Sequence, residues 1–211
     1  MINQKVIIIN YGWGGLPLQE LFKTIIKQDV KPFFSAQGYR TKDLNFYKTE
    51  GQLSYKINIQ KYKYNTHKQL SFYVNYSLHS EELAQYRPAS SLGLPHFYVR
   101  IRNIVLAAPE RYFLTPEVDV DKFTADLLLH LDQGLQFLYT LTDARAIIEY
   151  YMQRTALHLS EETFGFLLDT GDTETAEQYL KQLQAKYGAE KRWAILEKKY
   201  AAVWEKYGLK H

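Results

Sequence analysis

The chain of 211 residues is 46% hydrophobic and 23% charged and has no cysteine, which excludes a disordered protein, disulfides and thiolate chemistry. Residues 1–110 carry 14 Lys and Arg against 7 Asp and Glu, whereas residues 111–211 carry 12 against 16, so the net charge of +3 combines a basic and an acidic half. This basic excess is modest for a nucleic-acid-binding domain, and we favour the interpretation that lysines guard the edges of a sheet.

The first part of the chain predicts a short segment and then a helix. Residues 1–16 form an N-terminal segment in which Val6–Ile9 has the composition of a short strand. Apolar residues then recur at the three-to-four spacing of one helix face, which predicts a helix over residues 18–37. We expect Pro32 to kink or restart this helix and Gly38 to cap it.

A sheet is predicted next, because the apolar period changes to two. The predicted strands cover residues 44–49, 52–63, 69–79 and 96–105, with a loop over residues 80–95. After Pro116 the chain has no proline and its apolar spacing becomes helical. The predicted helices cover residues 119–141, 143–157, 161–169, 173–187 and 190–207.

This order of elements predicts an α+β fold. An N-terminal helix packs on a four-stranded antiparallel meander, and a C-terminal all-helical region follows. We divide the chain into the N-terminal segment 1–16, an α+β domain over residues 17–142 and a helical extension over residues 143–211. The apolar residues of the last helix form mostly one stripe, which favours packing within a monomer over a dimer.

Alternation along the predicted strands assigns the side chains to two faces. One face is apolar and suited to docking the first helix. The other gathers amides that donate and accept hydrogen bonds, arginines with a planar fork for carboxylate or phosphate, and tyrosines that can stack. A solvated sheet face is the alternative, although asparagine is disfavoured in strands. The candidate binding residues are Asn58, Gln60, Tyr62, Tyr73, Asn75, Tyr98, Arg100 and Arg102.

Catalytic and metal-binding patterns are not recognisable in the sequence. The chain has no phosphate-binding loop, dinucleotide fingerprint or nucleophile elbow. None of its six histidines has the spacing of a paired metal ligand. We therefore expect no metal, no cofactor and no enzymatic activity.

Four segments, in their order and spacing, resemble domain-of-unknown-function family 4304 over roughly residues 18–140. Arg100 and Arg102 resemble the paired arginines on the fourth strand of that family. The resemblance implies a small bacterial α+β protein, and some members occur in settings that suggest toxin–immunity systems. The segments are Phe33–Arg40, Asn45–Lys48, Ile57–Lys61 and Phe72–Tyr76.

Three functions follow from these observations. The first is a non-enzymatic binding protein that contacts another protein through the polar face, for example as an immunity protein that covers the active site of a toxin. The second is a nucleic-acid-binding protein that stacks bases on Tyr62, Tyr73 and Tyr98. The third is an enzyme that holds an anionic substrate in a pocket over Arg100 and Arg102.

The predicted location follows from two absences in the sequence. No stretch approaches the roughly 18 apolar residues of a membrane span. The apolar run Val6–Ile9 is also shorter than the roughly seven to fifteen residues of a secretory signal. We therefore expect a cytoplasmic protein with no membrane contact.

Overall fold

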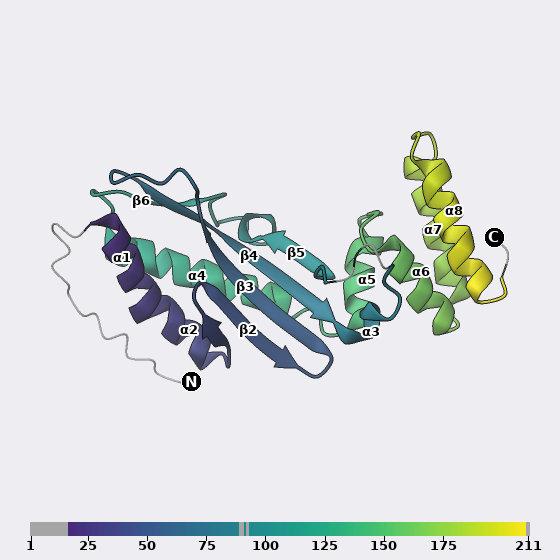
Figure 1. The fold of residues 1–211 in the computed structure, drawn as a ribbon, viewed down its shortest axis with the longest axis horizontal. Coiled ribbons are helices and arrows are strands. Elements are labelled where there is room, and N and C mark those ends of the chain that lie inside the picture. The colour runs from purple at the N-terminus through teal and green to yellow at the C-terminus, as the bar shows by residue number, and fades with distance from the viewer. Residues whose placement is uncertain (1–16, 89–90, 92, 210–211) are drawn as a thin grey trace.

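A twisted antiparallel sheet with helices on one face and at one end forms the fold, as Figure 1 shows. The computed structural model describes residues 17–88, 91 and 93–209. The predicted strand at Val6–Ile9 lies outside these residues. The strands are β1 (Arg40–Lys42), β2 (Asn45–Glu50), β3 (Leu53–Lys61), β4 (Leu70–Ser80), β5 (Phe97–Arg100) and β6 (Tyr112–Leu114).

The sheet has six strands where the sequence predicted four. The predicted four correspond to β2, β3, β4 and β5, which pair as an antiparallel meander. β1 adds to the edge beside β2, and β6 pairs with the first residues of β4. Each of these two strands has three residues, which is too short to show an alternation in the sequence.

The predicted fourth strand is also too long. β5 ends at Arg100, and the 3-10 turn η3 (Ile101–Asn103) follows it. Arg102 therefore lies off the sheet, although the sequence analysis placed it on the strand beside Arg100. Alternation continued through Val99 and Ile101, so the sequence pattern did not mark the end of the strand.

The N-terminal helix changes type along its length, and a new α-helical segment begins beside Pro32, where a kink or restart was predicted. The whole helix consists of α1 (Leu18–Ile25), the π-helical turn η1 (Ile26–Val30) and α2 (Lys31–Ala36). Pro32 is the second residue of α2, directly after the π-helical turn, where a residue without an amide hydrogen is tolerated. Gly38 ends the helix with a φ of +82°, as predicted.

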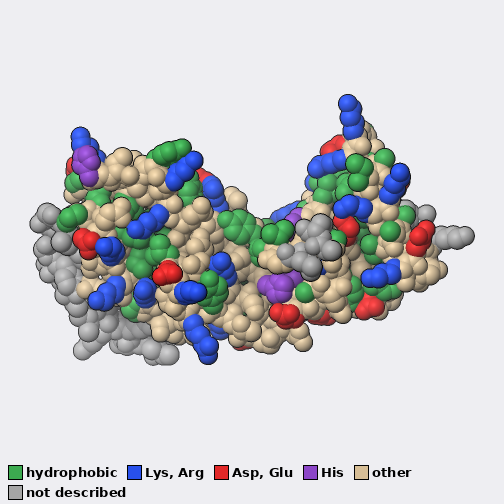
Figure 2. All heavy atoms as spheres, viewed as in Figure 1, with side chains coloured by type: hydrophobic (Ala, Val, Ile, Leu, Met, Phe, Trp, Pro, Cys, Tyr) green, Lys and Arg blue, Asp and Glu red, His purple; other side chains and the backbone are tan. Residues whose placement is uncertain are grey.

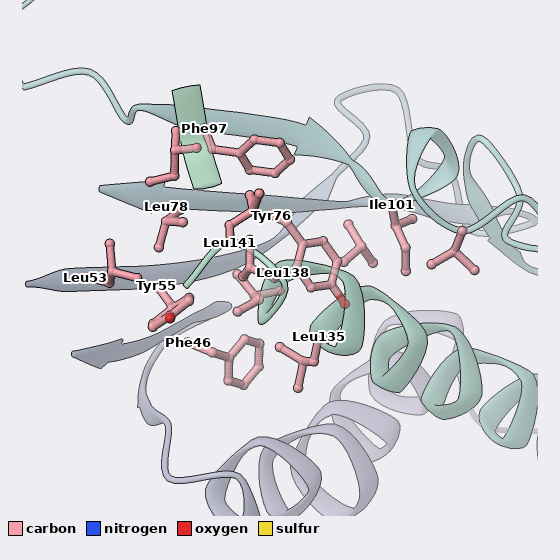
Figure 3. Packing of buried hydrophobic residues seen from close by; sticks show 14 of the residues in the cluster. Phe46, Leu53, Tyr55, Tyr76, Leu78, Phe97, Ile101, Leu135, Leu138 and Leu141 are labelled. Atoms are coloured by element: carbon pink, nitrogen blue, oxygen red, sulfur yellow. The ribbon is translucent and has the colours of Figure 1, made fainter. Parts of the chain in front are cut away.

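The core lies between the sheet and two helical segments, α1–α2 and α4 (Val120–Leu138), which cover the same face (Figure 3). The ring of Phe22 packs 5.3 Å from that of Phe72, between centroids. The hydroxyl of Tyr76 donates to the carbonyl of Leu131 over 2.9 Å. The apolar alternation of β3 and β4 is confirmed, since its residues are all buried: Leu53, Tyr55, Ile57, Ile59, Leu70, Phe72, Val74, Tyr76 and Leu78.

The C-terminal half is helical, as predicted, with element ends within five residues of expectation. α6 packs against α7 and α8, and α5 brings Tyr150 against Phe97 at the edge of β5. The predicted loop over residues 80–95 contains the short helix α3 (Glu81–Ala84), which Ser80 caps. No helix in the part of the chain described above is long and apolar enough to cross a membrane. The C-terminal helices are α5 (Ala144–Met152), α6 (Ser160–Asp169), α7 (Thr173–Tyr187) and α8 (Trp193–Lys206).

Candidate functional site

No described helix covers the sheet face opposite the core helices. In Figure 1, α4 runs behind the strands, so the viewer looks onto this face. Figure 2 shows the same view, with Lys and Arg side chains spread over the sheet around hydrophobic ones. We call this surface the open face. It consists of Arg40, Lys42, Asn45, Tyr47, Thr49, Ser54, Lys56, Asn58, Gln60, Tyr62, Tyr73, Asn75, Ser77, His79, Tyr98, Arg100, Arg111 and Phe113.

Strand register brings seven of the eight predicted residues together on the open face. One row across the sheet contains Asn58, Asn75 and Arg100, and Gln60 pairs with Tyr73 in the next row. Directly opposite residues of antiparallel strands share a face, so each row is a line of neighbouring side chains. Tyr98 lies on the same face of β5, and Tyr62, just after β3, places its ring 6.3 Å from that of Tyr73.

Arg102, the eighth predicted residue, points elsewhere. Its guanidinium donates to the carbonyls of Leu106 and Ala108 in the turn after η3. A cation satisfied by two carbonyls of its own turn orders that turn rather than the sheet. The predicted pair Arg100 and Arg102 is therefore not a joint anion clamp, because only Arg100 belongs to the open face.

A row of side-chain amides forms the floor of the open face. The amide of Asn58 donates to Asn45 over 2.9 Å, and that of Asn75 donates to Asn58 over 3.3 Å and to Gln60 over 3.1 Å. Asn75 is only 3% exposed, and its Oδ1 has no hydrogen-bond partner among the described residues. These amides bond mainly to one another, which explains why asparagine is tolerated in these strands. Asn45 was not predicted, although the alternation of its strand marks it.

We expect Asn75→Ala to lower the free energy of unfolding by about 1–2 kcal/mol, because it removes two hydrogen bonds and leaves the oxygens of Asn58 and Gln60 without their donor. Urea unfolding measures this change. Tyr98→Ala is the matched control on the same face, because its side chain is 55% exposed, and we expect it to cost less than about 0.5 kcal/mol. Equal losses in the two variants would contradict a structural role for the amide row.

Arginine and aromatic side chains alternate at the end of the open face that includes β6. The guanidinium of Arg100 lies 4.2 Å from the ring centre of Tyr73. The guanidinium of Arg111 lies 4.2 Å from Tyr62, 4.8 Å from Phe113 and 5.8 Å from Tyr73. Arg111 and Phe113 were not among the predicted site residues, because β6 is too short to show a periodic pattern in the sequence.

A hollow of about 430 Å³ lies at the end of the face nearer the C-terminal helices. Tyr47 and Tyr98, which line it, are 39% and 55% exposed, and Lys56 extends between their strands. Neither Arg100 nor Arg102 lines this hollow. The hollow has the dimensions of a small ligand or of one or two side chains of a partner. The described residues that line it are Tyr47, Ser54, Tyr55, Lys56, Asn58, Asn75, Ser77, Leu78, His79, Gly93, Pro95 and Tyr98.

The strand register gives the open face an excess of positive charge. Five cations belong to it: Arg40, Lys42, Lys56, Arg100 and Arg111. None of the described strand side chains that point to this face is a carboxylate. Carboxylates reach it from other elements, because Glu81 of α3 lies 3.6 Å from Nε2 of His79 and Glu110 of a loop forms an ion pair with Arg100. Both partners of that pair are about half exposed, so its contribution to stability is small. Arg40, Lys42, Lys56 and Arg111 form no ion pair with a described residue.

Histidines gather where the sheet meets the C-terminal helices. The rings of His79 and His96 lie 4.7 Å apart, and His158 approaches the carbonyl of His96 over 3.1 Å. Burial, with smaller contributions from nearby Arg87 and the other two histidines, lowers the pKa of His96 to about 3. Within the described residues, no group of three or more His, Asp or Glu side chains is arranged to hold a metal ion.

The model of one family, described as a domain of unknown function (DUF4304), matches residues 30–112. The predicted resemblance is confirmed over this segment, which covers β1 to β5 and every predicted site residue. Neither a curated protein nor a solved structure matches the chain.

Proposed function

We propose that this chain is a non-enzymatic binding protein whose open face docks onto an acidic surface of another protein. An immunity-type role in the bacterial cytoplasm, in which the face covers the active site of a toxin, is the form of this function that we propose. The observation that carries the proposal is a sheet face that no described helix covers, with exposed tyrosines beside a hollow and no carboxylate among the strand side chains that point to it.

The side chains of the open face are those that dominate protein interfaces. Tyrosine and arginine are enriched among the residues that contribute most to binding. Tyr47 and Tyr98 flank a hollow that accepts a side chain of the partner, and the amide row below holds the strands in register. A rigid floor with exposed aromatic anchors lowers the entropic cost of association.

The charge pattern favours an acidic protein over nucleic acid. Strong nucleic-acid binding rests on roughly six to ten phosphate contacts. The open face offers five cations, and Arg100 is already neutralised by Glu110. An acidic protein surface needs only a few such contacts, because tyrosine burial supplies the rest of the affinity.

The test is affinity capture from a lysate of the source cell with the immobilised full chain, before and after nuclease treatment. The double variant Tyr47→Ser, Tyr98→Ser is expected to lower the amount of captured protein at least tenfold, because an interface anchor is worth about 2 kcal/mol or more. Both side chains are exposed, so the melting temperature should change little.

The matched control removes two exposed hydrophobic side chains from other surfaces. Leu129 on α4 and Ile195 on α8 are 54% and 63% exposed, and the variant Leu129→Ser, Ile195→Ser should capture as well as the natural chain. Equal capture by all three proteins would refute the open face as the interface. Recovery of nucleic acid, with protein lost on nuclease treatment, would establish the nucleic-acid alternative instead.

A further inference from the structure

Arg111 contacts aromatic rings, and its side chain has no polar partner in the described part of the chain. It precedes β6, and its guanidinium contacts the rings of Tyr62, Tyr73 and Phe113 at 4.2, 5.8 and 4.8 Å. Among the described residues, no carboxylate or carbonyl accepts a hydrogen bond from its side chain. Its guanidinium is therefore a positioned cation whose donors are unused.

Other arginines of the chain show how unusual this is. Arg100 also lies on a ring, at 4.2 Å from Tyr73, but it forms an ion pair with Glu110. Arg154 lies 3.7 Å from the ring centre of Tyr150 and donates to the carbonyl of the same residue. In both cases the ring contact accompanies a polar acceptor, whereas Arg111 has the rings alone.

We propose that Arg111 is a carboxylate-binding residue that receives an aspartate or glutamate of an acidic protein partner. A guanidinium that contacts aromatic faces keeps its N–H donors in its own plane, where a carboxylate accepts two parallel hydrogen bonds. The three rings restrict the side chain before binding, so less entropy is lost when the carboxylate arrives. This inference rests on the proposed function, whose partner it specifies.

Charge balance selects a carboxylate over a phosphate monoester. Arg100, the other cation in contact with Tyr73, is paired with Glu110, so Arg111 is the one described cation in contact with Tyr62, Tyr73 or Phe113 that forms no ion pair with a described residue. A carboxylate brings one negative charge, whereas a phosphate monoester brings about 1.5 to 2 at neutral pH. A nucleic-acid backbone has a row of phosphodiesters and would need several unpaired cations along its path, whereas this cluster offers the guanidinium of Arg111.

The experiment follows the Arg Nε–Hε signals of the full ¹⁵N-labelled chain during titration with a hexaglutamate peptide at constant ionic strength. We expect the Arg111 signal to shift saturably. Arg111→Lys should weaken peptide binding at least tenfold, since lysine keeps the charge but lacks the planar fork. Arg102→Lys is the matched control, because its side chain bonds to turn carbonyls, and should bind as the natural chain does.

Three results would overturn the inference: an Arg111 shift that does not saturate, equal peptide affinity in Arg111→Lys, or saturation by an oligothymidine of the same charge at lower concentration. The amide spectrum of each variant reports whether it is folded. Captured protein that depends on Tyr47 and Tyr98 but not on Arg111 would leave the proposed function intact and refute this inference. Peptide binding that depends on Arg111, without any captured protein, would support this inference and refute the proposed function.

Discussion

Replacing Gly134 with alanine is expected to destabilise the protein by about 2 kcal/mol, although alanine is the better helix former. Gly134 lies on α4, and a Cβ atom there would sit 2.5 Å from both Cζ and Oη of Tyr76. Tyr76 is fully buried and its hydroxyl donates to Leu131, so the ring cannot retreat without losing this hydrogen bond.

The magnitudes decide the sign of this effect. Overpacking in a core costs about 1–3 kcal/mol, and the loss of the Tyr76 hydrogen bond adds about 1 kcal/mol. The higher helix propensity of alanine stabilises the folded state by about 1 kcal/mol. Because the ring is enclosed on every side, we expect a net loss, measured by urea unfolding.

The same substitution in a chain that lacks the Tyr76 ring tests whether this ring is the cause of the loss. In a Tyr76→Leu chain the ring is gone, so Gly134→Ala should be neutral or stabilising by up to about 1 kcal/mol. The coupling between the two positions is the difference between these two effects. An equal loss in both backgrounds would show that Gly134 is needed for a reason other than the Tyr76 ring.

Acid is expected to destabilise the protein through His96. Its side chain is fully buried, Nδ1 accepts from the amide of Ser80 over 3.0 Å, and Nε2 has no partner among the described residues. Burial, then Arg87, His79 and His158, lowers the pKa of this imidazole from 6.5 to about 3. Protonation would also abolish the acceptor that Ser80 uses.

The direction in which stability changes with pH follows from proton uptake by His96. Between pH 6.5 and about 3, the unfolded chain binds a proton at this histidine and the folded chain does not, so stability falls as the pH decreases. At pH 4 this contribution is on the order of 3 kcal/mol relative to pH 7. It fades as the pH rises above 6.5, because the imidazole then becomes neutral in the unfolded chain as well.

Urea unfolding of the natural chain and of His96→Gln between pH 7 and pH 4 measures the contribution. The variant starts from a lower stability at pH 7 but should lose less on acidification. His67→Gln is the control, because His67 is exposed in the turn between β3 and β4, and it should follow the natural chain. Parallel curves for all three proteins would contradict the assignment to His96.

Alternation and helical spacing were sufficient to predict the α+β class, the central strands and the long helices. The apolar residues of β3 and β4 are buried at every second position because a pleated strand turns alternate side chains to opposite faces. The cap at Gly38 followed from local geometry, since a positive φ favours glycine. These features depend on residues close together in the chain, and a single sequence contains them.

Alternation also assigned most strand residues of the open face, but only the tertiary structure decided which of them are neighbours and where the face ends. Register placed Asn45, Asn58 and Asn75 in one row, and a three-residue strand brought Arg111 to the rings of Tyr62 and Tyr73. The same long-range pairing ended β5 at Arg100 and left Arg102 in a turn. Pairing between distant segments depends on packing across the whole core, so neither period nor spacing along the chain determines it.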